Sequence, residues 1–101
     1  MPRPIKCRKV CHFPDILEFR PSNEKGGRGE GGEKEAVLLT VDEYETIRLI
    51  DKEGYSQEQC AGFMQIARTT VQRIYEIARK KVADAIVDGH PLRIEGGDLR
   101  W

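Results

Sequence analysis

The chain has 101 residues, 39% of them hydrophobic, which is enough for one small domain with a modest core. No apolar run approaches the ~18 residues of a membrane span, and no apolar stretch of a secretory signal follows the basic N-terminus. The three cysteines come with no sign of export, so we expect a reduced, cytoplasmic protein.

The net charge is zero, but charged residues are concentrated in two basic blocks and one acidic block. Residues 1–20 carry a net +3, residues 30–53 a net −5 and residues 65–81 a net +4. Such a chain can present a local basic surface to nucleic acid despite its neutral total. The alternative is that each block is only a solvated surface, and we expect the acidic block to be a solvated helix face.

The N-terminal third of the chain is expected to be mostly irregular. Four prolines make residues 1–21 a basic extended arm, in which residues 16–19 are predicted to form a short strand. Residues 22–35 are rich in glycine without a large apolar side chain, which predicts a flexible loop. The folded domain is expected over residues 36–97, followed by a tail at 98–101.

Two capping boxes mark helix starts in the folded domain. The box at residues 40–43 opens a helix predicted over about 41–52, and the box at residues 56–59 opens one over about 57–63. A third helix is predicted over about 68–88. Its core face is predicted from apolar residues at helical spacing: Val71, Ile74, Tyr75, Ala78, Val82, Ala85 and Ile86.

The chain is predicted to return to a strand after the third helix. Residues 92–95 alternate apolar and polar and precede two glycines, which indicates a short strand able to pair with the N-terminal extended segment. The expected fold class is therefore α+β, mainly α. We expect a three-helix core carrying a helix-turn-helix, with short terminal β-strands.

The corner between the second and third helices has the residue pattern of a helix-turn-helix. Ala61 is small where the two helices cross, and Gln65 occupies the corner position that often adopts positive φ and is usually Gly. Ala67 stands where a Ser would cap the third helix, and each departure costs about 1 kcal/mol. The surrounding core positions are predicted to be Cys60, Met64, Ile66, Val71 and Ile74.

Burial of those positions would turn the opposite face of the third helix to solvent, where it could enter the DNA major groove. Arg can pair with guanine and Gln with adenine, and a Thr methyl can touch thymine. The candidate base-reading residues are Arg68, Thr69, Gln72 and Arg73. The candidate phosphate contacts are Ser56, Gln57, Thr70, Arg79 and Lys80. The alternative is an ordinary three-helix bundle with a polar surface.

The segment LTVDEYETIRLIDKEGYSQEQCAGFMQIARTTVQRIYEIARKKVADAIVDGHPLRIEGG resembles a prokaryotic family of small predicted DNA-binding proteins. That family is known as domain of unknown function 134, and RPIKCRKVCHFPDILEFRP resembles its opening. The family's helix-turn-helix is similar to region four of bacterial sigma factors. The resemblance implies sequence-specific binding of double-stranded DNA, with the four reading candidates in that role. Members usually have Gly-Val-Ser-Arg where this chain has Gln-Ile-Ala-Arg at 65–68.

Cys7, Cys11 and His12 form a cluster that could begin a Zn or Fe–S site. The spacing is not that of a standard zinc finger, and a fourth ligand is missing because Cys60 is assigned to the core. We favour a reduced pair of thiols beside a basic arm, so no cofactor is expected. A metal- or redox-responsive sensor that uses this cluster is the alternative.

The remaining function classes have weaker support. The two histidines lie in separate irregular segments and no paired carboxylates are evident, so we expect no enzyme. The alternative binding role is a sigma-like module that docks on the transcription machinery through an acidic helix at 41–53. The expected partner is double-stranded DNA, bound by a homodimer that meets through the 92–95 strand and the N-terminal arm.

Overall fold

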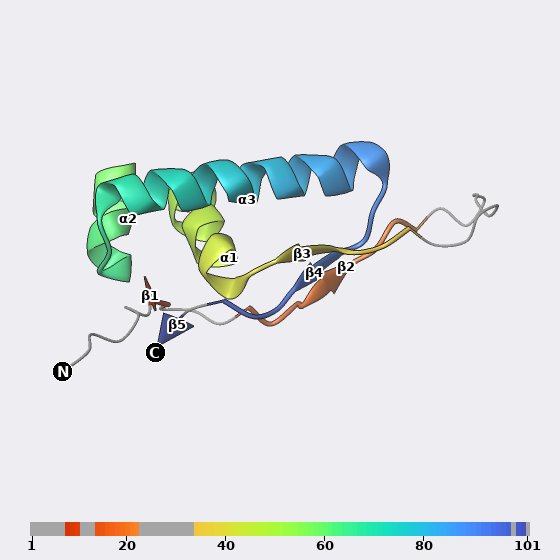
Figure 1. Cartoon of the computed structure of the whole chain (residues 1–101), viewed down its shortest axis with the longest axis horizontal. Coiled ribbons are helices and arrows are strands. Elements are labelled where there is room, and N and C mark those ends of the chain that lie inside the picture. Colours follow the sequence, from red (N-terminus) through yellow and green to blue (C-terminus); the bar gives the residue numbers. More distant parts are fainter. Residues whose placement is uncertain (1–7, 11–13, 23–33, 98, 101) are drawn as a thin grey trace.

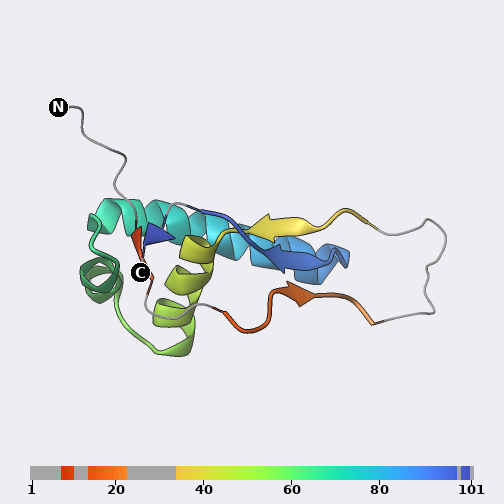
Figure 2. The same cartoon turned by 90° about the horizontal axis from the view of Figure 1, so that it is seen from below.

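The computed structural model describes residues 8–10, 14–22, 34–97 and 99–100. A long helix, α3, forms one side of the molecule, with α1 and α2 packed against its N-terminal half and a small sheet beneath its C-terminal half (Figures 1 and 2). This confirms an α+β fold that is mainly α. The elements in chain order are β1 (Arg8–Lys9), β2 (Glu18–Phe19), β3 (Val37–Leu39), α1 (Val41–Ile47), η1 (Arg48–Lys52), α2 (Gln57–Met64), α3 (Arg68–Asp88), β4 (Leu92–Ile94) and β5 (Leu99–Arg100).

Both predicted capping boxes are present. The Thr40 hydroxyl accepts a hydrogen bond from the Glu43 amide at 3.4 Å, and the Glu43 carboxylate accepts one from the Thr40 amide at 3.0 Å. Ser56 and Gln59 make the equivalent pair at 3.0 and 2.9 Å. Each box satisfies two backbone donors that a helix start would otherwise leave unpaired. The sequence therefore located these two helix starts correctly.

The end of the first helix differs from a regular α-helix. The prediction over 41–52 is met by α1 followed by η1, a π-helical turn in which the Glu53 amide donates to the Arg48 carbonyl at 2.9 Å. A π turn contains one residue more than an α turn, and no feature of the sequence marked it. Gly54, with φ +84°, then ends the helix as expected.

The sheet has the strand order β2-β4-β3. As predicted, the strand after the third helix pairs with the N-terminal segment: β4 is antiparallel to β2, with Phe19 opposite Leu92. The third strand, β3, was not predicted; it pairs with β4 in parallel, with Val37 also opposite Leu92. Both edges of β4 are thus occupied. In the segment expected to be a tail, β5 pairs in parallel with β1.

The core consists of two clusters that lie along α3. One fills the space where α3, α1 and the sheet meet and consists of Val10, Leu39, Val41, Ala78 and Ile94. The other fills the space where α2 meets α3 and η1 and consists of Leu49, Cys60, Ala61, Met64 and Val71. The predicted core face of the third helix is correct except at two positions: Tyr75 is only half-buried and joins neither cluster, and the last position, Ile86, is exposed. Ile86 is 74% exposed, because the core ends before the helix does.

The expectation of a solvated acidic face on the first helix is wrong for α1, although Asp51 and Glu53 at the end of the helix are exposed. Asp42, Glu43 and Glu45 are all buried, and Glu45 has no exposed surface. Glu45 accepts hydrogen bonds from Nε and Nη2 of Arg48 at 2.9 and 3.0 Å. Glu43 pairs with Lys81 of α3 at 2.8 Å. Because α1 packs against α3, these carboxylates are part of the packed interior.

One expectation concerns a part of the chain that the structure covers only in part. The flexible loop predicted at 22–35 lies mostly outside the described residues, as do residues 1–7 and 11–13. In the described ranges, no helix is long and apolar enough to cross a membrane.

Candidate nucleic-acid interface

The corner between α2 and α3 has the backbone geometry expected of a helix-turn-helix. Gln65 adopts φ 61° and ψ 45°, the left-handed conformation predicted for the corner, and caps the C-terminus of α2. The Ile66 amide donates to the Ala61 carbonyl at 3.1 Å, which closes the turn. At the start of α3, Ala67 is the N-cap residue and contributes no side-chain hydrogen bond, as expected.

Restoring the missing cap should stabilise the protein. We expect Ala67→Ser to raise the free energy of unfolding by about 1 kcal/mol, because Ala67 already has extended backbone geometry and a hydroxyl there can accept a hydrogen bond from the first turn of α3. Ala67→Val, which adds bulk without an acceptor, should give no gain. Urea denaturation of the three chains measures the difference, and equal stability of the Ser and Val variants would contradict it.

Packing fixes the rotation of α3 against α2. Met64 and Val71 have no exposed surface, and Ile74 is only 5% exposed. Thr46 of α1 donates a hydrogen bond to the Met64 sulfur at 3.5 Å, so all three helices meet at this side chain. Burial raises the pKa of the Cys60 thiol to about 11, which keeps it neutral within the same cluster. A rigid interior thus determines which side of α3 faces solvent.

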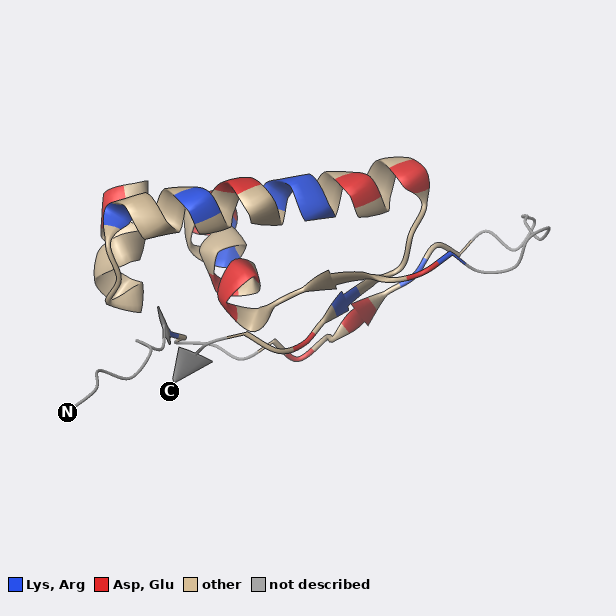
Figure 3. Ribbon diagram, viewed as in Figure 1, with Lys and Arg blue, Asp and Glu red and all other residues tan. Residues whose placement is uncertain are grey.

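The four candidate base-reading residues lie together on the solvent side of the first two turns of α3. Arg68, Thr69, Gln72 and Arg73 are all exposed, whereas Val71 between them is buried. Within the described residues, none of the four side chains makes a hydrogen bond or ion pair. Figure 3 shows further basic positions along α3, interrupted by acidic ones. The N-terminal end of the helix therefore presents free donors on a fixed surface.

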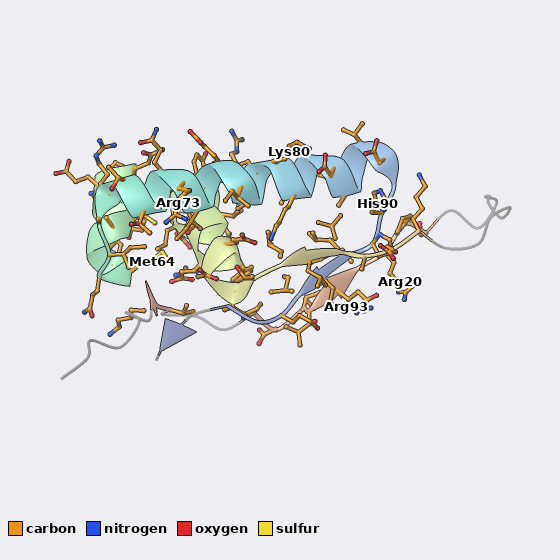
Figure 4. All side chains as sticks on the ribbon, viewed as in Figure 1. Arg20, Met64, Arg73, Lys80, His90 and Arg93 are labelled. Carbon is orange, nitrogen blue, oxygen red and sulfur yellow. The ribbon has the colours of Figure 1, made fainter. Side chains whose placement is uncertain are left out.

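The candidate phosphate contacts further along α3 have partners within the chain. Arg79 lies 3.3 Å from Asp51 and 5.3 Å from the centre of the Tyr75 ring, and the Tyr75 hydroxyl donates to Asp51 at 2.6 Å. Lys80 pairs with Asp84 at 2.8 Å, and this hydrogen bond raises the pKa of Lys80. Surface pairs of this kind are worth about 1 kcal/mol or less, so a phosphate can replace the carboxylate. Lys80 projects from α3 well beyond Arg73 (Figure 4).

The remaining phosphate candidates lie at helix starts. The Ser56 hydroxyl is engaged in the capping box, which leaves the amides of Gln57 and Glu58 as first-turn donors of α2. Thr70 is half-buried in the first turn of α3. Backbone amides are therefore the phosphate donors that this end of α2 can supply, with Glu58 an unfavourable charge beside them.

A scan against protein-family models adds the identity of the family. The model described as "Protein of unknown function DUF134" matches residues 1–101, the whole chain. The chain belongs to the DUF134 family. Its DUF134 relatives include UPF0251 proteins of Desulfitobacterium hafniense strain Y51, 54% identical over 99% of this chain and 76% of the relative, and of Caldicellulosiruptor bescii, 50% identical over 97% and 64%.

A third relative, the UPF0251 protein of Thermoanaerobacter sp. strain X514, is 46% identical over 99% of this chain and 84% of its own length. No solved structure matches the chain. These DUF134 comparisons confirm the predicted family, and none of the relatives' names states an activity or a ligand.

The metal candidates Cys7, Cys11 and His12 all lie outside the described residues. Among the residues that are described, no group of three or more His, Cys, Asp or Glu side chains is arranged to hold a metal ion. The structure therefore adds nothing to the prediction made for this cluster.

Proposed function

We propose that the protein binds double-stranded DNA in a sequence-specific manner through α2 and α3, without catalysis, and acts in transcriptional regulation. One observation carries the proposal. The first two turns of α3 expose Arg68, Thr69, Gln72 and Arg73 side by side, with no partner in the described chain, on a helix whose opposite side is locked into the core. Free donors on a rigid helix end are what base reading in the major groove requires.

The roles follow from position along the helix. Arg68 and Arg73 can each form a bidentate pair with guanine, and Gln72 can do so with adenine. Arg79 and Lys80, one to two turns further on, are placed to contact the DNA backbone after exchanging Asp51 and Asp84 for phosphate. The N-terminus of α2 adds backbone amides that can bind a phosphate and so fix the position of the protein along the DNA.

The alternative of docking on the transcription machinery through the acidic helix has less support. Its acidic side chains on α1 are buried, and Glu43 and Glu45 are paired with Lys81 and Arg48, which leaves Asp51 and Glu53 as its exposed carboxylates. These two are paired with Arg79 and Arg48, so the helix offers a partner little acidic surface. The burial of α1 therefore favours DNA binding by α3 as the function of this domain.

The proposal is tested by selecting a site from random duplex DNA and then comparing variants on the selected and a random duplex. Arg73→Ala is expected to weaken binding to the selected site by roughly 1–3 kcal/mol and to relax preference at one base pair. Lys80→Ala is expected to weaken binding to both duplexes equally. It should also lower by about one the slope of the logarithm of the binding constant against the logarithm of salt concentration.

A matched control is Arg93→Ala, which removes an arginine from the sheet at the other end of the molecule from the reading face (Figure 4). It should leave affinity, base preference and salt slope unchanged. If Arg73→Ala behaves like Arg93→Ala while the chain stays folded, α3 does not read bases and the proposal fails.

A further inference from the structure

Glu76 is an unpaired carboxylate on the side of α3 that carries the candidate base-reading residues. It is exposed, and in the part of the chain that the structure describes it makes no hydrogen bond or ion pair. Lys80, one turn further on, pairs with Asp84 at 2.8 Å instead. Glu followed by Lys four positions later is the order that favours an ion pair on a helix. The carboxylate is therefore free although a cation stands next to it.

Helix geometry turns Glu76 toward the same side as the reading residues. At about 3.6 residues per turn, its side chain points between Gln72 and Arg73, about 40° from the first and about 60° from the second. From Arg68 to Glu76 the axis advances about 12 Å, which is comparable to the width of the DNA major groove. Figure 3 shows the first acidic position of α3 flanked by basic positions on both sides. A helix that brings the four reading residues to the bases therefore brings this carboxylate there as well.

A carboxylate that faces DNA is unfavourable unless a base offers it a donor. Phosphates repel it, and in the major groove guanine and thymine present only acceptors to it. Adenine presents its N6 amino group beside the N7 acceptor, whereas cytosine presents the N4 amino group with no acceptor beside it on the same base. Cytosine is therefore the base that suits a carboxylate best.

We propose that Glu76 accepts a hydrogen bond from the N4 amino group of a cytosine and so acts as a fifth base-reading residue, which selects one G·C pair of the target site. This inference rests on the proposed function, since it requires α3 to lie in the major groove. Where no cytosine is present, the carboxylate loses water without gaining a donor and is repelled by the phosphates. Glu76 therefore selects its base both by attraction and by repulsion.

Site selection from random duplex DNA with wild type and two variants tests the assignment. Wild type should select a cytosine at one position. Glu76→Gln should select an adenine at that position, because a glutamine amide pairs with N6 and N7 of adenine. Glu76→Ala should lose the preference at that position and keep it at all others. An exchange of one base for another is a result that a merely structural side chain does not produce.

Affinities for the selected and a random duplex give a second readout. Glu76→Ala should lower the ratio of the two affinities roughly tenfold. It should also bind the random duplex more tightly than wild type does, because one negative charge is gone from the DNA-facing surface. Asp84→Asn is the matched control: it removes a charge about two turns further along the same helix, from a side chain that is 41% exposed. It should tighten binding to both duplexes alike and leave every base preference unchanged.

The outcomes separate this inference from the proposed function. If both Glu76 variants select the wild-type site and behave as Asp84→Asn does, Glu76 reads no base, and the proposed function still stands or falls with Arg73→Ala. A wild-type site without cytosine at the position that responds to Glu76 also overturns the inference. If wild type prefers no sequence at all, the proposed function fails and this inference with it. Thermal unfolding by circular dichroism checks that all variants fold, as expected for exposed side chains.

Discussion

Replacing Glu45 with alanine is expected to lower the free energy of unfolding by about 3–5 kcal/mol, the cost of breaking a buried ion pair by removing one partner. Glu45 has no exposed surface, and its two hydrogen bonds hold the guanidinium of Arg48, whose side chain is only 15% exposed. The hydrogen bond to Glu45 raises the pKa of Arg48. An arginine keeps its charge without such a bond, so Glu45→Ala leaves the guanidinium charged and without this partner.

Glu53→Ala is the matched control for this prediction. Glu53 approaches the same guanidinium at 3.5 Å but is 42% exposed, so its loss should cost less than about 1 kcal/mol. The double variant Glu45→Leu with Arg48→Met should recover most of the loss, because it leaves no buried charge. Urea denaturation followed by circular dichroism measures all three variants. Equal losses for Glu45→Ala and Glu53→Ala would show that the pair does not hold α1 in place.

Truncating Met64 is expected to have a similarly large effect. Met64 is fully buried between the three helices, in contact with Thr46 and Cys60, so Met64→Ala should cost about 2–5 kcal/mol. Met64→Leu, which keeps the volume, should cost less than about 1.5 kcal/mol. Thermal or urea unfolding gives both values.

Met64 also links stability to the candidate interface. It is the last residue of α2 and immediately precedes the Gln65 corner, so a cavity there should loosen the angle between α2 and α3. Under the proposed function, Met64→Ala should therefore weaken DNA binding even at temperatures where the chain is folded, and Met64→Leu should not. Equal DNA affinity of the Ala and Leu variants would show that the corner is held by other contacts.

The sequence predicted correctly those parts of the fold that depend on interactions between residues close together in the chain. Both capping boxes, the left-handed corner at Gln65 and the start of α3 depend on residues within a few positions of each other. The buried face of α3 follows from helical spacing, which predicts burial only where another element covers the helix. At Ile86 the spacing continues but the covering elements do not, so that prediction failed.

The missed features depend either on distant parts of the chain or on ion pairs that a count of charges does not reveal. The three-residue strand β3 forms because it lies beside β4, more than fifty positions later, and a short apolar run alone does not identify a strand. The burial of Glu45 depends on Arg48 being available inside the packed helices, which a count of charges cannot reveal. Likewise, the partners of Arg79 and Lys80 were not apparent from a pattern that treated basic residues as free.

Because β3 and β4 are neighbouring parallel strands, the three helices form the connection between them. Val37 and Leu92 are neighbours across the pair, and the Val41 amide bonds to the Gly96 carbonyl at 2.9 Å. The chain leaves β3 at Leu39, opposite Ile94, and enters β4 at Leu92, opposite Val37, so the three helices carry it back along the sheet to the start of the neighbouring strand. In evolution, a connection of this kind can be exchanged between proteins as one piece. Recombination could place all three helices between two adjacent parallel strands of another host without changing the host's path on either side.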